Sequence, residues 1–290
     1  MSSLAQNKSD NVRSNARSIA QITPGFAASD GDGVKLTRVI GSPDLNMVDP
    51  FLMLDRFGTD EPQDYVGGFP EHPHRGFQTV TYMLAGRMRH KDNAGNEGVI
   101  SLGGVQWMTA GRGVVHSEMP EQTEGRMEGF QLWVNLPAAQ KMTAPAYQEF
   151  GPDSVPVEAL LAGGSIHVIA GRTDQGTIGP VTMVSDTPLF LDVRLDKDAT
   201  FGQSVPPHYN GFVYVIDGSL TLGGANIETG SLGVLSDGDH VDISSSATDT
   251  RFLLVAGKAI NEPVARGGPF VMNTRAEIVQ AFQDFETGKF

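Results

Sequence analysis

The chain has 290 residues, enough for about two domains of ~150 residues each. Its formal charge of −13, from 34 acidic and 21 basic side chains, disfavours direct nucleic-acid binding through a basic patch. The absence of cysteine excludes disulfides, thiolate catalysis and cysteine-ligated zinc or iron–sulfur sites, and no apolar run is long enough for a membrane-spanning helix.

The first twenty residues are polar and contain no apolar core of a secretory signal. We expect residues 1–20 to form a flexible arm and the protein to be cytoplasmic, without contact to a membrane.

Short apolar runs then alternate with turn signals, which is typical of an all-β sandwich or barrel. Expected strands cover residues 79–84, 131–136, 165–170 and 189–195, and the segment 90–98 holds a cluster of turn residues. A Gly-, Pro- and acid-containing stretch at 151–164 marks the expected junction, so that the first domain covers 21–150 and the second 151–290.

Only the end of the chain shows helical periodicity. Ile278, Phe282 and Phe285 recur at helical spacing, Asn273 or Thr274 could cap the start, and a later glycine could end the helix. We expect a short C-terminal helix packed on the β structure.

One internal repeat stands out at an offset of 132 residues. The stretch TVTYMLAG at 79–86 matches GFVYVIDG at 211–218 in hydrophobic alternation, in its tyrosine and in its final glycine. Such a long period indicates duplicated domains, although a match this short could also arise between two unrelated hairpins.

Two pairs of candidate metal ligands occur in the first half. His72 and His74 stand at i and i+2 around a proline, and His116 and Glu118 form a second such pair. In extended chain, residues at i and i+2 project from one face, so two neighbouring strands would together offer three imidazoles and a carboxylate. Either pair alone is more often a surface loop or a solvated strand face. His90 lies between them beside Lys91, and we interpret it as a solvated turn residue or a group at the pocket rim, not as a ligand.

The segments FPEHPHRGF, QWMTAGRGVVHSEMP and QLWVNLP, with the tail GPFVMNTRAEI, resemble the pirin family of the cupin superfamily over about residues 35–290. The resemblance implies a bicupin, two facing antiparallel β-barrels of the jelly-roll type, with one mononuclear non-haem iron in the first. The family's metal ligands fall on His72, His74, His116 and Glu118. Fe(II) is the implied metal, with Mn, Ni, Cu, Co or Zn as alternatives.

One position departs from the general cupin pattern. Gln78 stands four residues after His74, where a glutamate is usual, and we expect its neutral amide to tune the surroundings of the metal. Arg75 and Arg112 flank the ligands and could steer an anionic substrate or simply pair with acids. The 132-residue offset places Ser204 and Pro206 at the positions of His72 and His74 in the second barrel. Aligning Gly238 with Gly111 places Ile243 at the position of His116, so we expect the second barrel to lack a metal.

The resemblance implies two functions. The first is a quercetin 2,3-dioxygenase-like oxidoreductase that cleaves a flavonol-like aromatic substrate with O2, with Glu118 as ligand and general base. The second is a redox-sensing regulatory protein, such as a transcription cofactor, that binds a transcription factor or a metabolic enzyme through the iron-site surface. A purely structural metal is a third possibility, and a monomer is the expected state.

Overall fold

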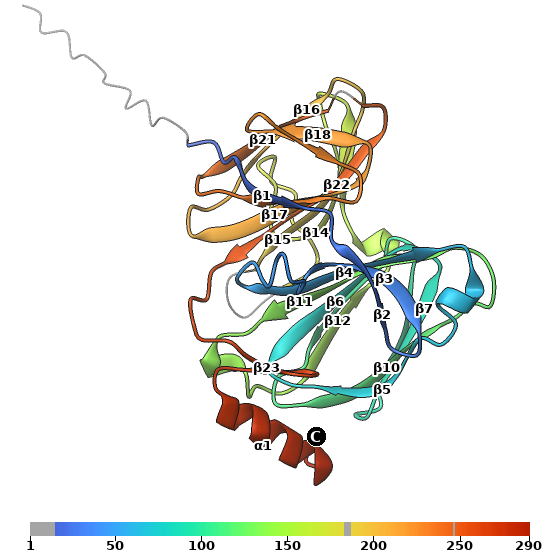
Figure 1. Ribbon diagram of the computed structural model, residues 1–290. Coiled ribbons are helices and arrows are strands. Elements are labelled where there is room, and N and C mark those ends of the chain that lie inside the picture. The colour runs from blue at the N-terminus through green and yellow to red at the C-terminus, as the bar shows by residue number, and fades with distance from the viewer. Residues whose placement is uncertain (1–14, 183–186, 246) are drawn as a thin grey trace, which may run out of the picture.

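The computed structural model describes residues 15–182, 187–245 and 247–290, so most of the expected N-terminal arm lies outside the described residues. The fold is almost entirely antiparallel β structure in two stacked halves, with one helix at the C-terminus (Figure 1). Each half packs a seven-stranded sheet against a four-stranded sheet, which is the jelly-roll form of a cupin domain and not a single closed barrel. The expected all-β bicupin is thereby confirmed.

The first half contains the lower pair of sheets in Figure 1. Its large sheet has the order β12-β9-β6-β11-β4-β3-β2 and its small sheet the order β5-β10-β7-β8. The large sheet comprises β2 (Phe26–Asp30), β3 (Val34–Ile40), β4 (Phe51–Thr59), β6 (Phe77–Ala85), β9 (Val105–Thr109), β11 (Met127–Asn135) and β12 (Ala146–Phe150). The small sheet comprises β5 (Phe69–His74), β7 (Arg87–Asp92), β8 (Glu97–Ser101) and β10 (Val114–Pro120).

The second half repeats this arrangement, with orders β1-β20-β17-β22-β15-β14-β13 and β16-β21-β18-β19. Its large sheet comprises β1 (Ile19–Thr23), β13 (Val157–Ala159), β14 (Gly164–Ala170), β15 (Leu189–Leu195), β17 (Tyr209–Asp217), β20 (Leu232–Leu235) and β22 (Thr250–Lys258). Its small sheet comprises β16 (Thr200–Ser204), β18 (Ser219–Leu222), β19 (Ala225–Glu228) and β21 (His240–Ser244). The remaining elements are β23 (Ala265–Gly267), β24 (Phe270–Met272), α1 (Arg275–Glu286) and the short 3₁₀ turns η1 (Pro62–Asp64), η2 (Ala138–Gln140) and η3 (Pro152–Ser154).

The duplication seen in the sequence is confirmed by the strands themselves. Strand β6 starts at Phe77 and β17 at Tyr209, and both their ends differ by 132 residues. The two strands also occupy the same position in sheets of the same strand order, between β9 and β11 and between β20 and β22. The predicted strands at 79–84, 131–136, 165–170 and 189–195 correspond to β6, β11, β14 and β15.

The two large sheets face each other across a shared apolar core. Phe51 of the first half and Phe212 of the second meet edge to face with ring centroids 5.4 Å apart, and Phe130 meets Tyr214 at 5.3 Å. Within this core the buried Tyr82 hydroxyl donates to Asp192 Oδ2 at 2.7 Å, and Asp192 also accepts two hydrogen bonds from Arg251. The halves are thus joined by aromatic packing and by one buried polar cluster.

Both ends of the described chain lie with the opposite half. Strand β1 pairs with β20 in the second half, at the sheet position that β12 occupies in the first half. Residues 263–290, which we call the C-terminal segment, carry β23, β24 and α1 to the bottom of the first half (Figure 1). The expected domain ranges, 21–150 and 151–290, stay a prediction, and these two exchanges cross them.

The C-terminal segment is stabilised by a helix cap within it and by long-range contacts with the first half. Thr274 caps α1 in a capping box with Glu277, as its spacing predicts, and Ile278 and Ala281 bury the inner face of the helix. The buried Lys141 donates from Nζ to Gly76 O at 2.7 Å, to Asn135 Oδ1 at 2.6 Å and to Val271 O at 3.1 Å. This single ammonium therefore joins β24 to the loop that follows β5.

Among the described residues, no helix combines the length and apolar character needed to cross a membrane.

Candidate metal centre

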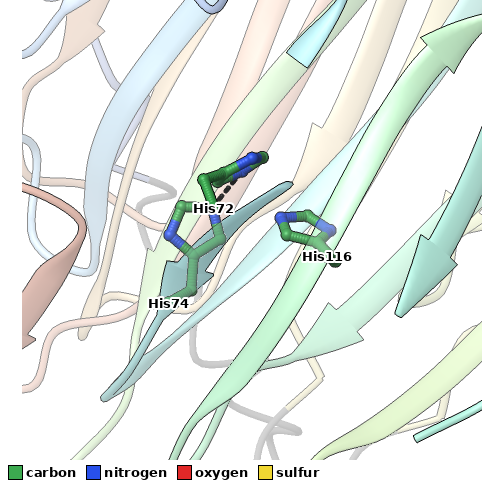
Figure 2. A group of neighbouring side chains, drawn as sticks. All are labelled: His72, His74 and His116. Carbon is green, nitrogen blue, oxygen red and sulfur yellow. Dashed lines mark hydrogen bonds between the residues drawn. The ribbon is translucent and has the colours of Figure 1, made fainter. Parts of the chain in front are cut away.

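Three imidazoles converge inside the first half, on its small sheet. Strand β10 pairs with β5 so that His116 lies opposite His72 and Val114 opposite His74. The i, i+2 spacing on β5 aims both of its imidazoles at the same face, where His116 joins them from the neighbouring strand (Figure 2). One nitrogen from each ring lies within 4.8 Å of the others.

The hydrogen bonds of His72 and His74 fix which nitrogens meet. His72 Nδ1 donates to Pro70 O at 2.7 Å, and His74 Nδ1 donates to Pro269 O at 3.3 Å. A neutral imidazole carries one proton, so both Nε2 atoms hold lone pairs, yet they face each other at 3.1 Å. Two facing lone pairs repel unless a cation lies between them, so this arrangement suits a metal ion.

His116 completes the group with an available nitrogen. Its Nε2 is buried and has no hydrogen-bond partner in the described part of the chain. Burial lowers the pKa of His74 to about 3, with the nearby His72 adding to the effect, and burial with the neighbouring histidines lowers the pKa of His116 well below its usual value. Both side chains are therefore neutral at physiological pH, which is the form that binds metal.

Glu118 lies beside this group without belonging to the set of converging atoms. It is buried and lines a cavity that His72 and His74 also line. Its carboxylate accepts hydrogen bonds from Thr81 Oγ1 at 2.9 Å and from Gln131 Nε2 at 3.3 Å. The Thr81 hydroxyl also lies 2.7 Å from Gln131 Oε1, and its one proton serves one of these two acceptors at a time. The assignment of Glu118 as a fourth ligand stays a prediction.

Imidazole nitrogens suit Fe, Ni, Cu and Zn, and a nearby carboxylate adds tolerance for Fe and Mn. The donor set therefore fits a mononuclear divalent metal, held by His72, His74 and His116 with Glu118 within the same pocket.

His72 and His74 line a cavity of about 760 Å³ whose walls come from both sheets of the first half and from the C-terminal segment. Trp133, Phe57 and Phe69 supply aromatic walls, and Arg266 and Pro269 come from the C-terminal segment. Arg38 lies on the wall with its guanidinium paired to both oxygens of Asp55, at 2.9 and 2.7 Å. A cavity of this size accommodates a drug-sized aromatic molecule.

The structure corrects the expected placement of two neighbouring residues. Gln78 sits on the opposite face of β6 from Thr81, donates to Thr109 Oγ1 at 2.9 Å and lines a separate cavity of about 320 Å³. It therefore cannot tune the metal surroundings directly. His90 is neither solvated nor in the turn, which spans residues 93–96; it lies on β7, is 1% exposed, and places Nδ1 at 3.3 Å from His116 Nδ1.

The two arginines also have structural surroundings. Arg75 is buried, donates to Asp284 Oδ2 at 2.8 Å and to Arg112 O at 2.5 Å, and stacks its guanidinium 4.3 Å from the centre of the Phe290 ring. Of the two roles considered for it, Arg75 therefore has the second, pairing with an acid. Arg112 is exposed, and neither arginine lines the cavity.

Sequence reasoning missed Gln131 and Trp133, which line the cavity, and Thr81, which donates a hydrogen bond to Glu118. Their signal was period two, because Thr81 alternates with buried apolar positions on β6, and Gln131 and Trp133 share one face of β11. Pro269, whose carbonyl holds His74, had no local signal, because its partner lies 195 residues away.

Comparison with known proteins gives consistent matches along the chain. The family model described as Pirin matches residues 33–134, and the one described as Pirin C-terminal cupin domain matches residues 190–290. A pirin-like protein from Caulobacter vibrioides is 53% identical, and the match covers 94% of this chain and 99% of that protein.

Two solved structures described as quercetin 2,3-dioxygenase from Acinetobacter baumannii share the fold. One superposes with a TM-score of 0.87 at 34% identity, covering 95% of this chain and 98% of the other. The second has a TM-score of 0.83 at 27% identity, covering 92% and 88%.

Proposed function

This chain belongs to the pirin family, and from that premise we propose that it is a metal-dependent dioxygenase that cleaves a flavonol-like aromatic substrate with O2. The observation that carries the proposal is the pair of facing Nε2 lone pairs on His72 and His74, with the available His116 Nε2 beside them. The relatives described as quercetin 2,3-dioxygenases support the substrate class. We propose Fe(II) as the metal, since imidazoles with a carboxylate suit it.

When bound, the metal supplies Lewis-acid and redox chemistry for the reaction with O2. The chain's own residues prepare the site for it. The Pro70 and Pro269 carbonyls orient the rings of His72 and His74, so the metal-binding nitrogens are fixed before any ligand arrives.

Glu118 has the position of a proton acceptor. Its carboxylate lines the cavity and is oriented by hydrogen bonds from Thr81 and Gln131. A flavonol hydroxyl that enters the cavity can transfer its proton to the carboxylate, which makes the substrate electron-rich for attack by O2. The aromatic walls from Trp133 and Phe57 contact the planar rings and exclude water.

The proposal is tested with protein purified without oxygen and loaded with Fe(II), followed by quercetin absorbance and O2 uptake. We expect coupled loss of flavonol and O2, and a decrease on the order of 100-fold or more in Glu118→Gln. Glu121→Gln, which alters an ion pair with Arg89 at the surface, is the matched control and should retain activity.

An iron-loaded protein that leaves quercetin intact, with Glu118→Gln equally inert, would refute the dioxygenase function. Loading with Mn, Ni, Cu or Co under the same assay distinguishes a wrong metal from a wrong reaction.

A further inference from the structure

The third metal-binding histidine has an unusual outer partner. His72 and His74 each point Nδ1 at a backbone carbonyl, whereas His116 points Nδ1 at the Nδ1 atom of His90, 3.3 Å away. His90 comes from β7, the strand on the other side of β10, and its ring lies 5.0 Å from that of His116. Both side chains are 1% exposed.

This hydrogen bond can contain only one proton. If His116 donates, its Nε2 is a bare lone pair that faces His72 and His74. If His90 donates instead, His116 must carry its proton on Nε2, where it blocks the metal position. The location of one hydrogen atom therefore decides whether the third ligand can bind.

We propose that His90 is a positioning residue that accepts the Nδ1 proton of His116 and so fixes His116 in its metal-binding tautomer. The inference rests on the metal site of the proposed function, but not on the dioxygenase reaction. Metal-binding histidines ordinarily donate this proton to a carboxylate, a carbonyl or water, which sets ring orientation and ligand basicity. Here the acceptor is the neutral imidazole of His90.

The packing around His90 supports a fixed orientation. The His90 ring packs against two aromatic neighbours: Tyr147, with centroids 4.9 Å apart and an interplanar angle of 61°, and His116, with centroids 5.0 Å apart. His90 Nε2 is buried and has no hydrogen-bond partner among the residues that the structure describes. The contact with His116 is thus the hydrogen bond by which His90 is anchored.

The tautomers can be observed directly in the full-length protein loaded with Zn(II), which is diamagnetic. Nitrogen-15 NMR correlation of the histidine rings should show His116 protonated on Nδ1 and bound through Nε2, and His90 protonated on Nε2. A His90 ring protonated on Nδ1 would overturn the proposal.

Variants test the consequence for metal binding. His90→Phe keeps a ring of similar volume but removes the acceptor, and we expect Co(II) affinity to fall roughly 10- to 100-fold with an altered visible absorption spectrum. His90→Gln restores an acceptor and should recover most of the affinity. His208→Phe, which removes an exposed imidazole from the second half, controls for adventitious metal binding.

A folded His90→Phe protein with the parent's Co(II) affinity and spectrum would refute the role of His90. Should that variant fail to fold, the NMR assignment and His90→Gln still decide the question. A parent protein that binds Zn(II) and Co(II) but leaves flavonols intact refutes the dioxygenase function alone.

Discussion

His74 and His116 are neutral near physiological pH because burial lowers the pKa of both side chains. Metal binding requires deprotonated imidazoles, and protons displaced from them make affinity depend on pH. In this site two of the three imidazoles have already lost that proton before the metal arrives. The free energy needed to desolvate these two rings is supplied during folding, by the packing around β5 and β10.

This predicts a small proton release on metal binding. At pH 6 the three imidazoles together should release at most one proton when Zn(II) binds, measured by calorimetry in buffers of different ionisation enthalpy. Glu118→Gln removes any share from the carboxylate and serves as the control. A release of two or more protons in that variant would contradict the neutral state of His74 and His116.

A second prediction concerns the buried hydroxyl that links the halves. Tyr82→Phe removes the donor to the charged Asp192, and we expect a loss of about 1.5–3 kcal/mol in unfolding free energy by chemical denaturation. Tyr65→Phe is the matched control, because that buried hydroxyl donates to the neutral carbonyl of Gly125 within the first half. If Tyr82→Phe lowers the unfolding free energy by no more than Tyr65→Phe does, the hydrogen bond to Asp192 contributes no more to stability than a hydrogen bond to a neutral carbonyl.

At the scale of elements, α1 is coupled to the end of β5, the strand that carries the candidate ligands His72 and His74. Arg75 follows His74 directly and pairs with Asp284 on the helix, and this pairing lowers the pKa of Asp284 to about 2. In addition, Val271 N donates to Arg75 O at 3.0 Å. The helix and β24 therefore hold the end of β5 from two sides.

We predict that Asp284→Ala loosens this coupling. Amide hydrogen exchange should become faster in α1 and in β24, because the helix loses its charged contact with Arg75. Glu286→Ala, which removes an exposed carboxylate at the end of the same helix, should leave exchange near the parent level. Equal protection in the two variants would contradict a role for the Arg75–Asp284 pair.

What the sequence could and could not predict follows the range of each signal. The capping box at Thr274 and the 132-residue repeat are local or self-similar patterns, and both are confirmed by the structure. The i, i+2 spacing correctly brings His72 and His74 together with His116, whereas the role of Glu118 as a ligand stays a prediction. The surroundings of Gln78 and His90 differ from the expected ones, because the spacing of a motif does not indicate which face of a strand a residue occupies or where a turn begins. The contacts of Pro269 and of β1 connect distant segments, and no local pattern announces them.

At the scale of the whole molecule, the two halves exchange segments at both ends. Strand β1 completes a sheet of the second half, while the C-terminal segment completes the metal pocket of the first. The shared aromatic core adds a third connection. A cut at the expected domain boundary would therefore leave each half without a segment that it uses.

This predicts that the metal site of the first half needs the C-terminal segment for full affinity. A chain ending at residue 262 lacks Pro269 and the partners of Arg75, and we expect it to bind Zn(II) at least roughly 10-fold more weakly, since lost outer contacts of metal ligands cost this much. Adding a peptide of residues 263–290 should recover part of the affinity. Full affinity in the shortened chain would contradict the prediction.

The position of the C-terminal segment also sets an order of events during synthesis. His116 is made long before Pro269, and at cellular elongation rates the interval is roughly 8–30 s. Throughout that time the nascent first half has all its ligand side chains but lacks the Pro269 carbonyl that orients His74. Stable metal uptake should thus follow synthesis of the C-terminal segment, so that a bound metal marks a chain in which this segment has packed onto the first half.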